Sequence, residues 1–531
     1  MPIREIKPSY SEWTLEHSAA GTHSTIHAQN IAVAGTVSLA LAAAASGGAV
    51  RYNEFTLQHT AAGAHTNHYY GVAWNESTDA YERTGELKGV AVGSSPGNSA
   101  LSIQPLMRRC VLSATGVVQY YLDPADSTKK LSGAASKLAG EDGQVMVEIP
   151  KFYRRYSYAS NVHQWDISPI LLPGFDVHPA FIKNGVEVDN RYVGAYEGVL
   201  FDASAATTTS DYNPIPAHAA TFDVDPGIIT AAAGTPYARL QAGDVIVVAA
   251  TAGTYDGTYI LATTSATVLT TTSVIAGVDG SATPTITAPT AATASDMLWS
   301  VSGKKPFTGV TRATFRDIAN NRGTGWRQFD FYLVSAIQLL YLTEYADFYT
   351  QSMIGNGLTD WATATWNTYN AYHSINNTGL SNGDGDVTAN VSGGDGVVGS
   401  YMTYRGIENW YGHVWKWVDG FNINSNVPYF SNTDTDFADD TATNYDVPSV
   451  TLHNADGYVS KLEQIAHGFL AATGGGSATT FLTDYYYQAS AWRVAALGGP
   501  AADGANAGGF YWYLNRASSY LGAHVGGRVS F

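Results

Sequence analysis

The sequence predicts a mixed α and β fold that is mostly β. Short apolar stretches with alternating polarity recur between turn residues, as expected of strands. Two stretches alone have the wider period of a helix. Only 14% of the 531 residues are charged, whereas 54 are glycine and 34 are tyrosine. This composition is typical of β-rich, loop-rich proteins of the extracellular space or of virion surfaces.

The first segment, residues 1–70, contains a short repeat. Residues 12–23 (Glu-Trp-Thr-Leu-Glu-His-Ser-Ala-Ala-Gly-Thr-His) are echoed by residues 54–65 (Glu-Phe-Thr-Leu-Gln-His-Thr-Ala-Ala-Gly-Ala-His). A repeated unit too small to bury a core implies stacking or pairing with other chains. We therefore expect an oligomerising stalk or attachment segment. Its histidines, among them His23 and His65, are either metal ligands on a three-fold axis or surface residues that the repeat duplicates.

The same segment predicts neither secretion nor a membrane span. The basic residues near Met1 are not followed by the apolar run of a signal peptide. Residues 30–50 are uncharged but dominated by Ala, Gly, Ser and Thr, which favours a packed stalk over membrane insertion.

The single cysteine, Cys110, excludes a disulfide within the chain and fits assembly in a reducing cytoplasm.

Residues 71–202 predict the first, β-rich part of the main domain. Within it, residues 144–158 and 163–168 read as two strands of a hairpin, separated by a turn. Residues 203–297 then become rich in Ala, Thr and Gly, with short strands at regular spacing. They predict a small all-β module inserted in a surface loop, serving either as a spacer or as an accessory glycan-binding domain.

Residues 298–531 contain the two predicted helices and an aromatic cluster. A Thr cap opens a helix over 311–320 that ends near Gly323, and a second helix over 331–345 is apolar over a wide face, so we expect sheet on both sides of it. Residues 350–400 read as loop. Trp410, Trp415 and Trp417 follow, and the alternation from Trp415 predicts a core strand with two unlike faces.

Clustered aspartates raise the possibility of a cation site. Asp384 and Asp386 alternate in a Gly-rich loop, so they could hold structural calcium or could simply be solvated turn residues. The same two interpretations hold for a second group, which comprises Asp434, Asp436, Asp439 and Asp440.

The net charge of −17 excludes two classes of partner. A nucleic-acid-binding protein needs a basic face, and an anionic membrane surface would repel this chain. We expect neither partner.

The sequence motifs of the main domain resemble the formylglycine-generating-enzyme branch of the C-type lectin fold. The matching residues are 412–418 (Gly-His-Val-Trp-Lys-Trp-Val), 493–499 (Arg-Val-Ala-Ala-Leu-Gly-Gly) and 527–531 (Gly-Arg-Val-Ser-Phe). More closely, residues from about 71 to 531, without the inserted module, resemble bacteriophage tail-fibre tip proteins that carry this domain, including receptor-binding proteins diversified by phage retroelements. That resemblance is carried by residues 107–112, 143–153, 194–198, 405–410 and 484–487.

This resemblance implies a receptor-binding surface near the C-terminus, displayed on a lectin-like sheet. Tyr, Trp, Ser and Asn are also the residues that binding surfaces favour. Strand alternation predicts that about half of the set is exposed. The alternative is that alternate members, Phe510, Trp512 and Leu514, simply belong to the core. The implied binding residues are Phe510, Tyr511, Trp512, Tyr513, Asn515, Arg516, Ser518, Ser519, Tyr520, Leu521 and His524.

The expected function is adhesion rather than catalysis. The resemblance implies a homotrimeric tail-fibre protein, made in the host cytoplasm and carried on the virion. It would bind a host-surface glycan or protein and attach to other tail proteins through its N-terminus. The family's oxidase activity uses a copper-bound cysteine pair, and no cysteine follows Cys110. A glycan-degrading tail enzyme, the main alternative, would need two carboxylates flanking the bond, and no spacing marks such a pair.

Overall fold

The computed structural model describes ten stretches of side chains. They are residues 68–204, 206–208, 215–237, 240, 242–249, 252–287, 295–360, 376–392, 399–466 and 468–531. The backbone alone is described for residues 35–39, 55–59 and 209. The chain divides into two units, residues 1–68 and 69–531. In the first unit, β1 (Gly35–Leu39) pairs with β2 (Phe55–His59) in antiparallel register. His23 and His65 lie outside the described residues, so the predicted axial metal does too.

The second unit begins with a five-stranded antiparallel sheet. β9 and β10 form the predicted hairpin, and its two turn residues, Ser160 and Asn161, both have positive φ, as a tight two-residue turn requires. Residues 144–158 are nevertheless two strands of different sheets, because Pro150 has no N–H to continue the ladder. Across the sheet the order is β11 (Asp176–Val177), β9 (Tyr153–Ala159), β10 (Val162–Ser168), β3 (Tyr70–Asn75) and β4 (Ala80–Gly85).

A seven-stranded sheet joins the beginning of the main domain to its end. The last strand of the chain pairs with β14, so residues 71–202 and 298–531 share one sheet. The order is β25 (Arg327–Gln328), β37 (Val529–Ser530), β14 (Asn190–Gly194), β8 (Gln144–Pro150), β5 (Arg108–Leu112), β6 (Val118–Asp123) and β7 (Asp126–Lys130). A short hairpin of β12 (Ile182–Lys183) and β13 (Val186–Glu187) precedes β14.

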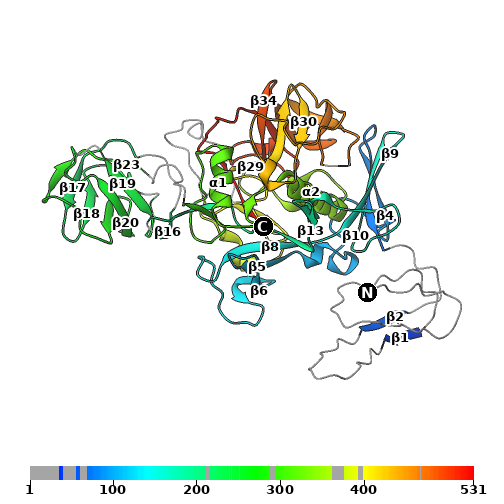
Figure 1. Ribbon diagram of the computed structural model, residues 1–531, viewed down its shortest axis with the longest axis horizontal. Helices are drawn as coiled ribbons and strands as arrows, with labels where there is room; N and C mark the ends of the chain where they lie inside the picture. Colours follow the sequence, from blue (N-terminus) through cyan, green and yellow to red (C-terminus); the bar gives the residue numbers. More distant parts are fainter. Residues whose placement is uncertain are drawn as a thin grey trace. The chain divides into compact units, whose positions relative to one another are not determined.

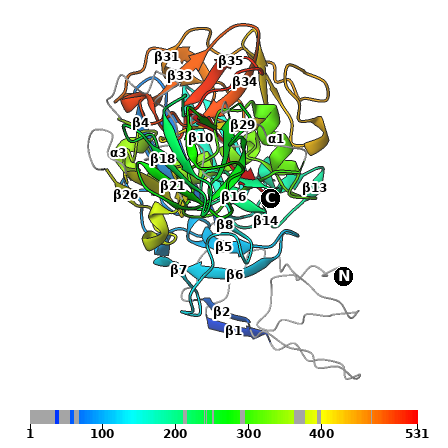
Figure 2. The same cartoon turned by 90° about the vertical axis from the view of Figure 1, so that its left-hand side faces the viewer.

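The C-terminal sheet has eight strands and carries the aromatic cluster. The second unit, residues 69–531, is called the main unit below. In Figure 2, β31, β33, β34 and β35 lie at one end of it, and β5, β6 and β7 lie at the other. The order is β30 (Val427–Phe430), β29 (Trp415–Asn424), β34 (Trp492–Leu497), β35 (Trp512–Arg516), β33 (Leu482–Gln488), β31 (Gly457–Leu462) and β32 (Ala471–Gly474), with β36 (Val525–Gly526) beside β29. A smaller sheet contains β26 (Asn390–Val391), β27 (Tyr401–Tyr404) and β28 (Ile407–Glu408).

Both predicted helices are confirmed. In α1 (Arg312–Asn320), the Thr311 side chain accepts a hydrogen bond from the Thr314 N–H, as a cap does. All residues of α2 (Phe331–Tyr345) are buried, since the helix contacts β29 of one sheet and β3 and β10 of another. A short helix, α3 (Thr350–Ile354), corrects the prediction of loop from residue 350. The chain is therefore a mixed α and β protein that is mostly β (Figure 1).

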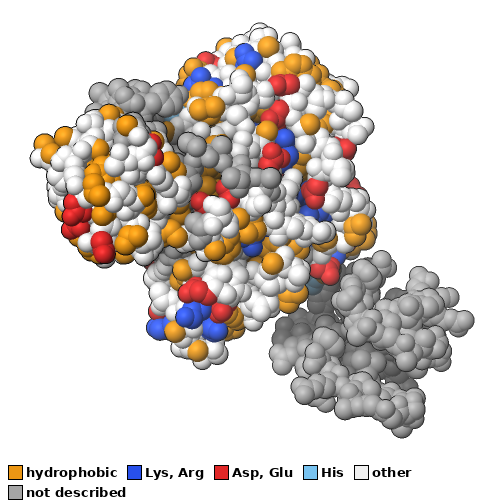
Figure 3. Space-filling view, turned by 60° about the vertical axis from the view of Figure 1, so that its left-hand side comes forward, with side chains coloured by type: hydrophobic (Ala, Val, Ile, Leu, Met, Phe, Trp, Pro, Cys, Tyr) orange, Lys and Arg blue, Asp and Glu red, His pale blue; other side chains and the backbone are white. Residues whose placement is uncertain are grey.

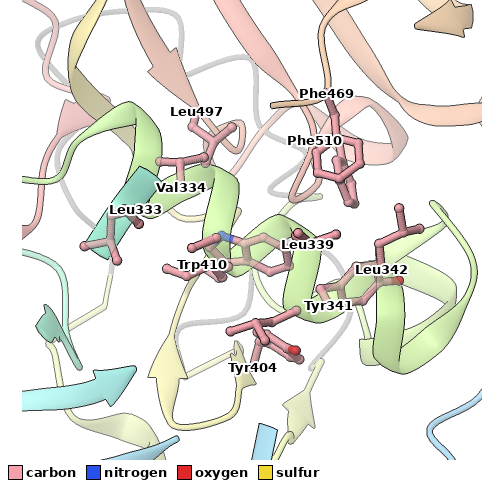
Figure 4. Packing of buried hydrophobic residues seen from close by; sticks show 14 of the residues in the cluster. Leu333, Val334, Leu339, Tyr341, Leu342, Tyr404, Trp410, Phe469, Leu497 and Phe510 are labelled. Carbon is pink, nitrogen blue, oxygen red and sulfur yellow. The ribbon is translucent and has the colours of Figure 1, made fainter. Parts of the chain in front are cut away.

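The side chains around α2 form the main core. The Tyr341 ring lies 5.7 Å from Tyr404, 5.6 Å from Trp410 and 5.8 Å from Phe510, measured between ring centroids. Figure 4 shows these aromatic rings gathered around the helix, together with Phe469. Because each large ring buries much apolar area, this contact is a major source of stability.

Residues 203–297 contain a separate sheet with its own core. β15 (Val199–Asp202) pairs with β24 (Met297–Trp299), so the chain leaves and re-enters the main unit at adjacent strands. β16 (Thr207–Thr209) also pairs with β15. The module's strands, green in Figure 1, are β22 (Gly280–Ala282), β17 (Ala220–Asp223), β18 (Ile228–Ala231), β21 (Val268–Thr271), β20 (Gly257–Thr264), β19 (Val245–Ala249) and β23 (Thr285–Thr287).

A search of the described residues for membrane-spanning helices found none of sufficient length and apolarity.

Candidate functional site

The first part of the predicted binding surface lies in the core. Phe510 and Trp512 are buried, which corrects their assignment to the binding surface and agrees with the alternative that they belong to the core. Tyr511 and Tyr513 are buried too, each with 4% exposure, which corrects the prediction that they face solvent. The Tyr513 ring stacks on Trp415 at 4.3 Å and 17°, and Tyr511 meets Trp415 edge-on at 4.6 Å. Alternation predicted a solvent face for β35, but aromatic side chains cover both of its faces.

The exposed candidates lie at the end of β35 and in the turn after it. Ser519 and Leu521 are exposed, and the other five are half-buried: Asn515, Arg516, Ser518, Tyr520 and His524. Five of these seven residues line a shallow depression of about 530 Å³. Its lining residues are Arg493, Asn515, Arg516, Ala517, Ser519, Tyr520 and Leu521. The structure thus brings much of the predicted surface together at the turn that follows the strand, and it adds Arg493 from β34.

Contacts with the core hold this turn in place. The Arg516 guanidinium lies 4.3 Å from the Tyr520 ring centroid and 5.2 Å from that of Tyr513, and its Nε donates to the Tyr513 hydroxyl. The Tyr520 hydroxyl lies 3.2 Å from His524 Nε2. Ser518 donates a hydrogen bond to Asp440. Because side chains on both arms of the turn are fixed in this way, the lining residues are preorganised for contact with a partner.

The environment of His524 sets its charge. Burial, together with the nearby Arg516 charge, lowers the pKa of His524 to about 4. The imidazole is therefore neutral at pH 7, and the positive charge of the depression comes from its arginines.

The sequence motifs that carried the resemblance meet in a buried ion cluster. Glu197 belongs to the loop before β15 and contacts residues at the start of β29. Its Oε2 lies 2.5 Å from His413 Nδ1, and its Oε1 lies 3.0 Å from Lys416 Nζ. Arg528 lies close by and donates to the carbonyls of Gly194, Ala195, Glu408 and Asn409. Burial alone would raise the pKa of Glu197, but the His413 and Lys416 charges lower it to about 2. These motif residues therefore support the sheet and do not reach the surface.

β29 lies in the core, as predicted. Its two charged residues, Lys416 and Asp419, are fully buried as well. Trp410, Trp415 and Trp417 are buried as predicted. The signal that sequence reasoning missed is a lysine inside an apolar run, which marks a buried ion pair as well as it marks a solvent face.

The aspartate candidates are hydrogen-bonded to protein groups. Asp386 Oδ1 accepts from the Arg109 N–H at 2.6 Å, and burial raises the pKa of this carboxyl to about 6. Asp384 Oδ2 accepts from the Tyr401 hydroxyl at 2.6 Å. In the second group, Asp434 pairs with Arg327, and Asp439 pairs with Arg312 and Arg316. These four aspartates are half-buried, and their carboxylates bond to protein groups. No group of three or more metal-ligating side chains occurs in the part of the chain that the structure describes.

Comparison with protein-family models and with curated proteins found no match to this chain.

Proposed function

We propose that this chain is a bacteriophage tail-fibre tip protein with a lectin-like C-terminal domain that binds a receptor on the host cell surface. The binding site is the depression after β35, together with the exposed side chains of Ser519 and Leu521. The observation that carries the proposal is the architecture of this site. A turn with polar and aromatic side chains is fixed by a stacked aromatic core behind it.

The convergence of separate motifs supports the lectin-like assignment. Residues 194–198, 405–410, 412–418 and 527–531 are far apart in the sequence, yet each contributes to the surroundings of Glu197 or of Arg528. Motifs that recur together in a family are expected to form one structural unit, and here they do so beneath the C-terminal sheet.

The proposal is of a binder that has no enzymatic activity. None of the residues lining the depression is a carboxylate, so this site lacks the acid and base of glycoside hydrolysis. The single cysteine is buried on β5, and burial raises the pKa of its thiol. One thiol cannot form the cysteine pair of the family's oxidases.

We further propose that the protein acts as a homotrimer on the virion. The N-terminal repeat would join the three chains and attach them to other tail proteins. Three tethered sites act at a high effective concentration, so weak binding at each would still give firm adsorption.

A cell-binding assay tests this proposal. Labelled full-length protein is incubated with a panel of bacterial strains, beside a variant in which Ser519→Trp and Leu521→Ala reshape the depression. We expect the wild type to adsorb to at least one strain. The amount of the variant that adsorbs to the same strain should be at least tenfold lower. Leu131→Ala is the matched control, because Leu131 is exposed to a similar extent (60% against 57% for Leu521) but lies away from the site.

Two results would refute the proposal. If the variant adsorbs as well as the wild type, the receptor binds elsewhere on the chain. If soluble sugar fragments appear while wild-type protein is incubated with its target strain, the chain is a depolymerase.

A further inference from the structure

The depression carries a local charge that contrasts with the rest of the chain. The protein has a net charge of −17, yet the two ionisable groups expected to be charged in the lining at pH 7 are Arg493 and Arg516. Figure 3 shows one face of the molecule, on which acidic and basic side chains form small groups among uncharged ones. A concave site of one charge sign concentrates ligands of the opposite sign.

Both arginines have guanidinium nitrogens without an acceptor among the described residues. Arg493 donates from Nη1 to the Trp492 carbonyl at 2.7 Å, and Arg516 donates from Nε to the Tyr513 hydroxyl. Neither lies within salt-bridge distance of a described carboxylate. Other arginines of the main unit differ: Arg312, Arg316 and Arg405 each pair with a buried or nearly buried carboxylate.

The geometry of Arg516 suits recognition of a planar anion. The guanidinium carbon lies 4.3 Å from the Tyr520 ring centroid, and the terminal nitrogens of Arg516 have no acceptor among the described residues. A carboxylate accepts two parallel hydrogen bonds from such a group, and these charge-assisted bonds are stronger than neutral ones. Little side-chain entropy would be lost on binding, since the aromatic contact already orders the arginine.

The form of the site favours a saccharide over a peptide. An extended peptide commonly binds by adding a strand to a free sheet edge. β35 offers no such edge, because β33 pairs with one side of it and β34 with the other. The depression is instead small and open, and it is bordered by the hydrogen-bonding side chains of Asn515 and Ser519 and by the Tyr520 ring. Such side chains suit the hydroxyl groups and the apolar faces of sugar rings.

We infer that the receptor ligand is an acidic saccharide whose carboxylate binds Arg493 and Arg516 in this depression. The inference rests on the proposed function, because it assigns the ligand class of the same surface.

The test uses the surface polysaccharide of a strain to which the full-length protein adsorbs. The polysaccharide is purified and compared before and after carbodiimide-mediated reduction of its carboxyl groups to alcohols. We expect the reduced form to bind at least tenfold more weakly. Arg493→Gln and Arg516→Gln should each weaken binding of the untreated form by about tenfold, as loss of a charge-assisted hydrogen bond does. Arg493→Gln should change binding of the reduced form little, whereas Arg516→Gln also removes contacts that hold the turn, so its effect on the reduced form is subtracted.

Two further variants control for charge and folding. Lys88→Gln removes one positive charge from an exposed side chain outside the site and should leave binding unchanged. Arg516→Lys keeps the charge but loses the planar donor, so it should retain partial binding with an unchanged melting temperature. If Arg516→Gln does not fold, Arg493→Gln and Arg516→Lys decide the question.

The outcomes separate the inference from the proposed function. If no strain adsorbs the wild-type protein, the proposed function fails. If cells adsorb it but carboxyl reduction or the arginine substitutions have no effect, the ligand class is wrong and the binding function stands. If protease treatment of the cells abolishes adsorption while the purified polysaccharide does not bind, the receptor is a protein, which also overturns the inference.

Discussion

Replacement of Glu197 by glutamine should destabilise the main unit by about 3 to 5 kcal/mol at pH 7. The substitution removes the counter-charge of Lys416, which is fully buried and whose Nζ lies 3.0 Å from Glu197 Oε1. Breaking a buried ion pair by removing one partner costs about this much, because the other charge stays buried. A second substitution, Lys416→Met, should recover part of the loss, since it removes the unpaired charge.

The acid dependence gives an independent magnitude. The pKa of Glu197 falls from its usual 4.5 to about 2 in the folded chain. A carboxyl with a lowered pKa stabilises the fold fully above its unfolded pKa, and this contribution is lost as the pH falls through 4.5 towards 2. The shift corresponds to about 3 kcal/mol. Glu197→Gln should therefore lose less stability than the wild type between pH 5 and pH 2.

Denaturant unfolding followed by tryptophan fluorescence measures both effects. The inserted module, residues 203–297, contains no tryptophan, so its own unfolding contributes no such signal. Glu82→Gln is the control, because Glu82 is exposed and lies 3.8 Å from the exposed Lys88. Such pairs contribute little. If the free energy of unfolding of Glu197→Gln lies within about 1 kcal/mol of the wild-type value at pH 7, the ion cluster does not support the sheet. This threshold is about one-third of the expected loss.

Three further predictions follow from the fold. Deleting residues 203–296 and closing the gap with a short Gly-Ser turn should leave the tryptophan-monitored melting temperature within a few degrees of the wild type; loss of a cooperative transition would show that the main unit needs the module. Tyr513→Ala should cost about 3 to 5 kcal/mol, because the ring is stacked in the core, whereas Tyr513→Phe should cost far less; equal melting temperatures would contradict this. Asp484→Asn should raise the melting temperature at pH 8, since burial raises the pKa of Asp484 and the wild type loses stability as the pH rises above the unfolded value. If Asp484→Asn and the wild type have equal melting temperatures at every pH from 5 to 8, this last prediction is refuted.

Local signals predicted the regular elements well. Thr311 marked the start of α1, and the wide apolar face of residues 331–345 predicted that sheet would lie on both sides of α2. These predictions succeeded because capping and hydrophobic period act over a few residues. Sheet membership did not follow in the same way. The pairing of Val193 with Ser530 joins residues that are distant in sequence, and neither strand carries a mark of its partner.

The candidate site was predicted in part. The predicted set includes Asn515, Arg516 and residues 518–521, which are half-buried or exposed, but it also placed Tyr511 and Tyr513 at the surface. Alternation fixes which side chains share a face, while exposure depends on what packs against that face. Here Trp415 comes from a neighbouring part of the sheet and covers both tyrosines. Arg493 was not among the predicted residues, because only the pairing of β34 with β35 brings it to the turn.

The pairing of β15 with β24 has a consequence for the evolution of the gene. Both ends of residues 203–297 leave the main unit from strands that are hydrogen-bonded to each other, with Val199 opposite Trp299. A recombination event that exchanges this segment for another with adjacent ends keeps the surrounding register intact. The junction therefore permits a module to be removed or exchanged without a change in the pairing of the surrounding strands. It is also the position at which a fluorescent reporter can be grafted without displacing the C-terminal sheet.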